Sequence, residues 1–153
     1  MDRELKVKNL RVGTRVLLER PLGRFTERAA INNKYLFIAG GIGITPIRSL
    51  IESLATKKSD MVLLYANKTR EDVVFKNELI PIIKRHHNIF SESGNGELEK
   101  GYVDEKKLTH FVPDIATRDI YLCGPPGMMN SVLKILKDIG IKKSHIHYEN
   151  FSY

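Results

Sequence analysis

The hydrophobic and polar positions of this chain divide it into two unequal parts. Residues 12–18 and 22–26 surround Pro21 and Gly23, a pattern that predicts two short strands joined by a turn. Beyond residue 33, compact apolar runs alternate with segments of helical spacing. The first part therefore predicts a β-hairpin, and the second part predicts a separate domain of mixed strands and helices.

The second part predicts five strands separated by helices. The expected strands are the apolar runs 34–39, 61–65, 87–90, 119–123 and 146–151. The expected helices lie around residues 47–54, 73–83, 104–110 and 129–136. Pro81 lacks a backbone N–H, so it predicts a kink or an early end in the second helix. The polar stretch 91–101 contains three glycines and predicts a loop.

This order predicts an α/β fold with a doubly wound, five-stranded parallel sheet of the Rossmann-like type. Strands that alternate with helices form parallel sheets covered by helices on both faces. Continuous apolar strands agree, because both faces of such strands are buried. Ligands of these sheets bind outside the carboxyl ends of the strands, where the strand order reverses.

Composition indicates an ordinary globular domain. The chain has 153 residues, of which 42% are hydrophobic and 28% charged, and no apolar run approaches the ~20 residues needed to cross a bilayer. The opening segment MDRELKVKNLR is not a secretory signal, so we expect a cytoplasmic protein without a membrane span. The net charge is +7, but no basic run is interleaved with aromatic residues. This pattern argues against nucleic-acid binding and favours an acidic protein partner.

A glycine-rich segment follows the first expected strand and opens a helix. Gly40, Gly41 and Gly43 would let the backbone turn tightly and approach a diphosphate without a Cβ in the way. Thr45 suits a helix N-cap and Pro46 the first helical position, so the free N–H groups of the first turn would face an anion. Pro46 replaces the third glycine of G-x-G-x-x-G, and a plain tight turn is the alternative interpretation.

A second loop of similar kind follows the fourth expected strand. Its sequence CGPPGM covers residues 123–128, and its cysteine is the only one in the chain, which excludes an internal disulfide and a cysteine-ligated cluster. Cys123 at a strand end can face a bound ring, or it can be a small buried hydrophobe. A nucleophilic cysteine needs a nearby base, and nothing in the sequence pairs His145 or His147 with it.

The chain ends in an aromatic tail. Phe151 and Tyr153 follow the last expected strand, at the same edge of the sheet as the two loops. Either ring could stack on a planar cofactor, or both could simply dock the end of the chain.

Taken together, the motifs GGIGITP, CGPPGMM and ENFSY resemble the ferredoxin–NADP reductase superfamily. The nearest resemblance is to bacterial and archaeal FAD- and NAD(P)H-binding oxidoreductases, and it runs over nearly the whole chain. Residues 12–16 and 22–25 look like the last hairpin of the family's flavin barrel. Residues 63–79 resemble the second strand and helix of its nucleotide domain, the ferredoxin-reductase C-terminal type. The resemblance thus implies a flavin-barrel remnant at 1–32 and an NAD(P)-binding domain at 33–153.

The resemblance also implies site residues. The pyrophosphate and nicotinamide would be held by Gly40, Gly41, Gly43, Thr45 and Pro46. The nucleotide would be lined further by Gly124, Pro125, Met128 and Tyr153. Cys123 would sit beside the nicotinamide C4 and shape the pocket rather than attack. Glu149 and Phe151 would approach the flavin, with Phe151 covering its ring until nicotinamide displaces it.

The choice between NAD(H) and NADP(H) depends on the loops after the second and third strands. Asn67, Lys68 and Arg70 follow the second strand, and the two cations could bind a 2′-phosphate or form a solvated loop face. Glu92 stands where NADP enzymes of the family often have arginine. Its carboxylate would repel a phosphate and could bond a ribose hydroxyl, so Glu92 favours NAD(H).

The family's flavin-binding signature, R-x-Y-S/T, is absent from this chain. We therefore expect NAD(H) or NADP(H) binding here, with FAD bound only together with a flavin-binding domain supplied in cis or in trans. Hydride would pass from NAD(P)H to FAD, and electrons onward to an iron–sulfur or haem partner. The chain alone would show little reductase activity. The alternative is a non-catalytic nucleotide-binding or interaction subunit of a larger redox complex.

Overall fold

The computed structural model describes residues 11–15 and 25–149 and contains five strands and four α-helices in that part of the chain. The strands are β1 (Lys34–Gly40), β2 (Asp60–Asn67), β3 (Arg85–Phe90), β4 (Asp119–Cys123) and β5 (Ile146–Glu149). The helices are α1 (Ile44–Ala55), α2 (Lys76–Leu79), α3 (Glu105–Phe111) and α4 (Pro126–Asp138). Short 3-10 turns occur at η2 (Glu27–Ala29), η3 (Gly41–Gly43), η4 (Ile115–Thr117) and η5 (Lys143–His145).

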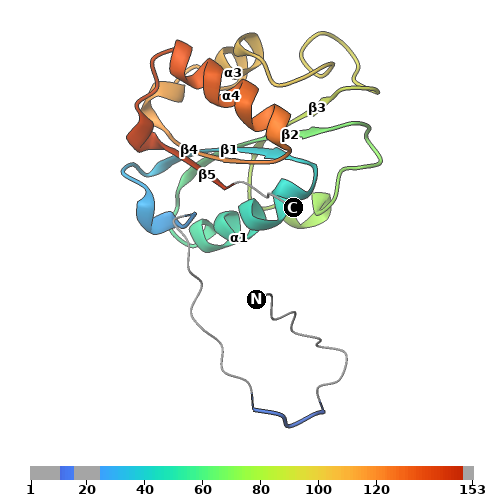
Figure 1. The fold of residues 1–153 in the computed structure, drawn as a ribbon, viewed down its shortest axis with the longest axis vertical. Helices are drawn as coiled ribbons and strands as arrows, with labels where there is room; N and C mark the ends of the chain where they lie inside the picture. Colours follow the sequence, from blue (N-terminus) through green and yellow to red (C-terminus); the bar gives the residue numbers. More distant parts are fainter. Residues whose placement is uncertain (1–10, 16–24, 150–153) are drawn as a thin grey trace, which may run out of the picture.

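The strands form one parallel sheet in the order β3-β2-β1-β4-β5. In Figure 1, α3 and α4 lie on one side of this sheet and α1 on the other. The expected doubly wound α/β fold with five parallel strands is confirmed. The strand order reverses between β1 and β4, so the carboxyl ends of these two strands are where a ligand is expected.

Two apolar clusters fill the space between the sheet and its helices. One joins Phe37 and Tyr121 of the sheet to Ile47 and Ile51 of α1. The other cluster joins the opposite face of the same strands to α3 and α4, and its members include Leu36, Ile38, Leu122, Val132 and Leu136. Because strand residues alternate between the two faces, a continuous apolar run is needed to supply both clusters.

The first helix begins earlier than the sequence pattern suggests. Gly43, not Thr45, is the N-cap of α1, so the expected assignment of Thr45 as N-cap and Pro46 as first helical residue is wrong. The cause is η3, whose 3-10 turn leads directly into the helix. Pro46 in the first turn lacks an N–H that would have had no partner within the helix.

The second helix is short, as Pro81 predicts. It covers only Lys76–Leu79 rather than the expected 73–83, and Phe75 before it has a left-handed φ of 58°. The early end expected from Pro81 is confirmed, because α2 ends at Leu79 and only a single turn follows it, closed by the hydrogen bond from the Ile83 N–H to the Leu79 carbonyl at 2.8 Å.

The described ends of the expected hairpin are not strands. Thr14 donates its N–H to the Arg11 carbonyl at 3.0 Å, and Gly13 has a φ of 91°, so residues 11–15 form a turn. Residues 25–26 lead into η2. The rest of the hairpin, residues 16–24, lies outside the described residues, and the domain boundary at 33 stays a prediction.

The segment 25–32 is fastened to the sheet. The Tyr121 hydroxyl donates to the Thr26 carbonyl at 2.8 Å, and the Asp119 carboxylate accepts the backbone N–H groups of Ile31 and Asn32 at 3.0 and 2.6 Å. Phe25 packs edge-on against the Tyr121 ring. These contacts hold the segment against β4, next to α1 (Figure 1).

Candidate functional site

The two glycine loops meet at the carboxyl edge of the sheet. Ala39 of β1 is aligned with Cys123 of β4, so the segments that follow these residues start side by side. A Cβ added to Gly43 would lie 2.2 Å from the Cys123 carbonyl oxygen, and one added to Gly40 would lie 2.6 Å from the Met128 sulfur. The loops are therefore in van der Waals contact, and glycine is required for that contact.

Gly41 has a different environment from its two neighbouring glycines. Its φ of 49° lies in the left-handed region, and a Cβ placed there would meet no atom within 4 Å. The Gly41 carbonyl accepts a hydrogen bond from the Tyr65 hydroxyl at 3.3 Å, and this bond ties the turn to β2. The backbone at Gly41 is thus open on its outer side, where an anion can approach without meeting a side chain.

Two helices begin at this edge. α1 has 12 residues and starts at Ile44, and α4 has 13 residues and starts at Pro126. The first N–H groups of a helix have no partner within it, and the helix dipole makes this end electropositive. Two such ends beside an open backbone fit the charge and hydrogen-bonding needs of a diphosphate. Thr45, in the first turn of α1, is exposed, as is Pro125, which precedes α4.

Cys123 is buried at the end of β4. Burial, with a smaller contribution from the charge of Glu149, raises the pKa of its thiol to about 11. The thiol is therefore neutral near pH 7 and a weak nucleophile. Neither histidine activates it, because His145 and His147 both lie beside Asp119, with His147 Nε2 at 2.9 Å from the carboxylate. This arrangement argues for a cysteine that shapes the site and against covalent catalysis.

Glu149 lies next to Cys123 across the sheet. The two residues are aligned in the β4–β5 pairing, and the Glu149 side chain is exposed. The structure therefore brings together the first glycine loop, the second glycine loop and Glu149. Phe151 and Tyr153 lie outside the described residues, so their expected roles stay predictions.

The remaining candidate residues lie on the other side of β1. The loops after β2 and β3 are joined by two backbone hydrogen bonds, from Ser91 to the Asn67 carbonyl at 3.1 Å and from Glu92 to the Lys68 carbonyl at 2.9 Å. Lys68 and Glu92 are exposed. Asn67 is partly buried, and its side-chain N–H₂ group has no hydrogen-bond partner among the described residues.

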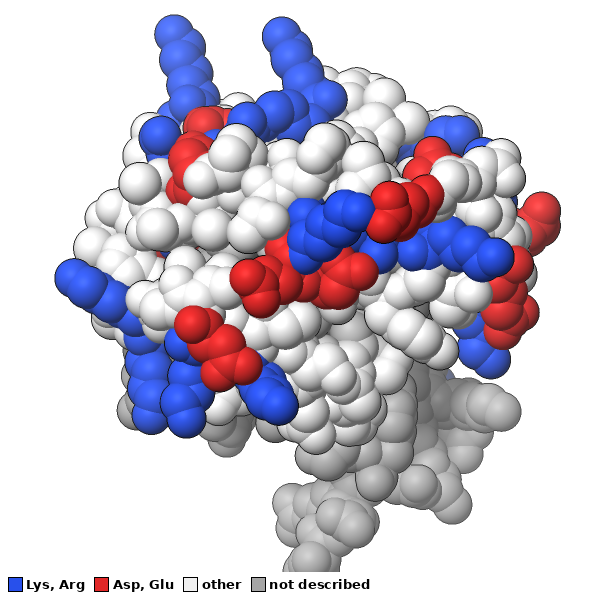
Figure 2. Space-filling view, turned by 90° about the horizontal axis from the view of Figure 1, so that it is seen from above, with Lys and Arg blue, Asp and Glu red and all other residues white. Residues whose placement is uncertain are grey.

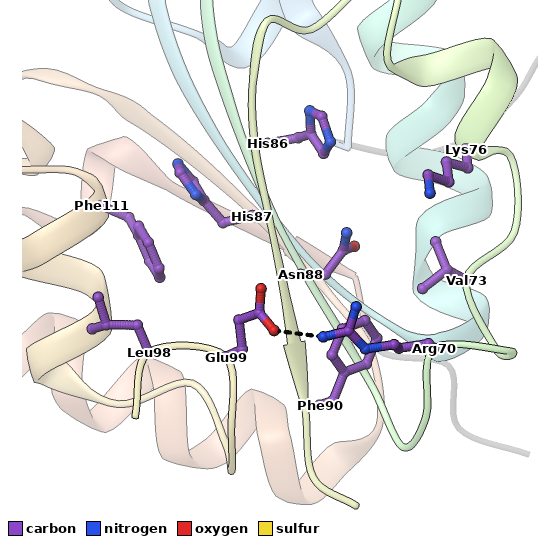
Figure 3. Close-up of a pocket in the computed structure, with 10 residues that line it drawn as sticks. All are labelled: Arg70, Val73, Lys76, His86, His87, Asn88, Phe90, Leu98, Glu99 and Phe111. Atoms are coloured by element: carbon purple, nitrogen blue, oxygen red, sulfur yellow. Dashed lines mark hydrogen bonds and ion pairs between the residues drawn. The ribbon is translucent and has the colours of Figure 1, made fainter. Parts of the chain in front are cut away.

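Arg70 forms an ion pair with a carboxylate that the sequence pattern did not single out. Its guanidinium donates to the Glu99 carboxylate at 2.8 Å. The pair borders a cavity of about 550 Å³ beside the edge strand β3 rather than over the glycine loops. Figure 3 shows the side chains around this cavity, with the ion pair between the loops that follow β2 and β3. The two residues are 29 positions apart, so no local spacing could have indicated the contact.

Within the residues that the structure describes, no helix has both the length and the apolar character needed to cross a bilayer.

Comparison with known proteins identifies the family. A family model described as the oxidoreductase NAD-binding domain matches residues 37–134. The glycine betaine monooxygenase reductase subunit of Chromohalobacter salexigens is 31% identical over 154 residues, covering 94% of this chain and 42% of the relative. NADH-cytochrome b5 reductase 2 of Neurospora crassa is 32% identical, covering 78% of this chain and 38% of the relative.

A solved structure agrees with these relatives. The flavohem-like FAD/NAD-binding domain of nitric oxide dioxygenase from Vibrio cholerae superimposes with a TM-score of 0.69 and 30% identity, covering 76% of this chain and 50% of that one. This chain spans about two fifths of the length of the curated relatives reported above. The superfamily resemblance read from the three motifs is confirmed. The chain belongs to the oxidoreductase NAD-binding domain family, the nucleotide-binding part of ferredoxin-reductase-like, FAD-linked reductases.

Proposed function

We propose that this chain binds NAD(P)H across its two glycine loops and presents the nicotinamide ring for hydride transfer to FAD on a flavin-binding domain. The contact between the loops, with the open backbone at Gly41 and two helix N-termini at the same edge, is the observation that carries the proposal. When bound, the nicotinamide supplies the hydride, and the protein supplies orientation and electrostatics.

Different groups of the chain bind the diphosphate and position the nicotinamide. First-turn N–H groups of α1 and α4 donate hydrogen bonds to the diphosphate. Cys123 and Glu149, aligned on β4 and β5, line the nicotinamide end of the site. The thiol of Cys123 stays protonated, so it fills space beside the ring without competing for it. Phe151 and Tyr153 would cover the flavin and the nucleotide, respectively.

We further propose that the electrons pass to an iron–sulfur or haem partner. The similar proteins are named as a monooxygenase reductase subunit, a cytochrome b5 reductase and a nitric oxide dioxygenase, which supports redox delivery without selecting one acceptor. On the face that carries α3 and α4, Lys and Arg side chains alternate with Asp and Glu (Figure 2). Because positive and negative side chains are mixed on that face, it offers no large positive patch. We expect an acidic partner to bind a different face.

The direct test is calorimetric titration of the full chain with NADH and with NADPH. Saturable binding of at least one nucleotide is expected, and Gly41→Val should weaken it because a branched side chain would strain the left-handed backbone and cover the open surface. Gly140→Val, just beyond the other end of α4, is the matched control, because its φ of 81° and the open space around an added Cβ reproduce the strain away from the glycine loops. Absence of binding to both nucleotides would refute the proposal. Binding that supports no reductase activity once a flavin-binding domain is added would favour a non-catalytic subunit.

A further inference from the structure

The Arg70–Glu99 ion pair stands at the side of the site away from the nicotinamide. We infer that Glu99 makes this chain select NAD(H) over NADP(H), by occupying the arginine that would otherwise receive a 2′-phosphate. The inference rests on the proposed function, since it concerns the adenosine end of the same bound nucleotide.

Arg70 is held in place from several directions. Its guanidinium donates to Glu99 at 2.8 Å and lies 5.5 Å from the centre of the Phe90 ring. Its backbone N–H donates to the Ser93 hydroxyl at 3.1 Å. The Asn95 N–H donates to the same Glu99 oxygen at 3.3 Å. The charge of Arg70 is thus directed toward the protein's own carboxylate.

Strand order places this pair on the adenosine side. Cys123 and Glu149 lie at the ends of β4 and β5, so the nicotinamide end of a dinucleotide centred on β1 and β4 points that way. The other end must extend over β2 toward β3, whose end is two strand spacings, or about 10 Å, from β1. The loops that follow β2 and β3 carry Arg70 and Glu99 and form the wall of the site there.

The 2′-phosphate of NADP(H) would meet an unfavourable set of charges at this wall. It carries a charge of about −1.5 to −2 near pH 7 and needs fixed cationic donors. Lys68 and Arg70 lie there beside the carboxylate residues Glu92 and Glu99, because the Glu92 N–H bonds the Lys68 carbonyl and Glu99 pairs with Arg70. The Arg70 side chain is 49% exposed, so a phosphate could reach the outer part of its guanidinium, but the phosphate would then lie beside the Glu99 carboxylate. NAD(H), with a hydroxyl at the same position, meets no such repulsion.

The experiment compares NADH and NADPH affinities of the full chain by calorimetry. Glu99→Gln removes the competing charge, so NADPH should bind roughly tenfold more tightly, the size expected for loss of one like charge about 5 Å away in a solvated site. NADH affinity should stay within about twofold. Adding Arg70→Ala to Glu99→Gln should abolish the gain.

Glu97→Gln is the matched control. Glu97 lies in the same loop and loses the same charge, but its carboxylate pairs with Lys106 rather than Arg70. An equal gain in NADPH affinity in both variants would overturn the inference, because a general charge effect would then explain the result. A parallel loss of NADH affinity in Glu99→Gln would do the same, since Glu99 would then only hold the loops together.

The wild-type titration separates the two proposals. NADH bound more tightly than NADPH supports both. NADPH preferred by the wild-type chain would overturn the role of Glu99 and leave the proposed function standing. No binding of either nucleotide would overturn the proposed function, and this inference with it.

Discussion

At the scale of single residues, the glycines of the first loop serve two separate purposes. Gly40 and Gly43 allow the first loop to touch the second, because any Cβ there would collide with Met128 or with the Cys123 backbone. Gly41 allows a left-handed turn and leaves open space outside it. The first purpose concerns stability and the second concerns ligand access, so substitutions at these positions should have different consequences.

Gly43→Ala should destabilise the fold. The added methyl would lie 2.2 Å from a backbone oxygen, which cannot move without displacing the loop, and overpacking of this kind typically costs about 1–3 kcal/mol. Gly127→Ala, whose Cβ would meet nothing within 4 Å, should be neutral or slightly stabilising. Urea unfolding midpoints of both variants test this, and equal stability of the two would contradict the close contact between the loops.

Cys123 should be unreactive in the folded protein. Its thiol is buried, with a pKa of about 11 against an ordinary value of 9.0, so a thiol reagent at pH 7.5 should modify it only after unfolding. The raised pKa favours folding below pH 9, and this contribution is lost as the pH rises toward 11. The loss should be about 2–3 kcal/mol and absent in Cys123→Ala. Rapid labelling of the native protein would contradict the buried position.

At the scale of elements, the carboxyl and amino ends of the strands have different roles. The carboxyl ends of β1 and β4 carry open loops, while the amino ends are fastened by Arg118. This arginine is fully buried before β4 and donates to the carboxylates of Asp60 and Asp114, each at 2.8 Å, and to the Tyr35 carbonyl at 3.2 Å. It thereby joins the starts of β1, β2 and β4, away from the loops that are proposed to bind the nucleotide.

Arg118→Met should destabilise the protein by about 1–3 kcal/mol. Removing one partner of a fully buried ion pair typically costs more, but the two carboxylates are 45% and 33% exposed and can be hydrated. Lys34→Met also removes a partner of Asp114, yet it should cost less than about 0.5 kcal/mol because that pair is solvent-exposed. Chemical unfolding of both variants near pH 7 measures the contrast.

The hydrogen bonds of Arg118 also predict how the stability of the fold changes at acidic pH. The Arg118 guanidinium holds the pKa of the Asp114 carboxyl at about 2, below its ordinary value of 3.8. A lowered pKa stabilises the fold above about pH 4, and this stabilisation is lost as the pH falls toward 2. In Arg118→Met this part of the acid dependence should be reduced. An unchanged pH profile between 4 and 2 would contradict the pairing.

The elements themselves were largely predictable from the sequence. Residues 35–39 and 120–123 are buried and apolar on both faces of their strands, which is a requirement of a parallel sheet covered on both sides. The start of α1 was not predictable, because the glycines of η3 adopt a helical turn that their composition does not indicate. Contacts between distant loops, such as that of Arg70 with Glu99, have no signal in local spacing.

At the scale of the whole molecule, ligand binding and folding are coupled. A nucleotide that binds the edge between β1 and β4 contacts two loops that exist only in the folded chain. Binding must therefore shift the unfolding equilibrium by mass action.

NADH at one hundred times its dissociation constant should raise the free energy of unfolding by about 2.7 kcal/mol. For a domain of this size, the melting temperature should rise by roughly 5–10 °C. A thermal unfolding series with increasing NADH measures the shift, with inorganic phosphate at equal ionic strength as the control. Equal shifts with phosphate and NADH would indicate general anion stabilisation rather than a dinucleotide site.

The attachment of residues 25–32 bears on how this domain can be joined to another. Hydrogen bonds from Tyr121 to Thr26 and from Ile31 and Asn32 to Asp119 hold both ends of that segment. A polypeptide fixed at two points cannot swing freely, so any unit joined ahead of residue 25 would begin its path beside α1. The place where such a unit's chain enters this domain would then be set by these few bonds.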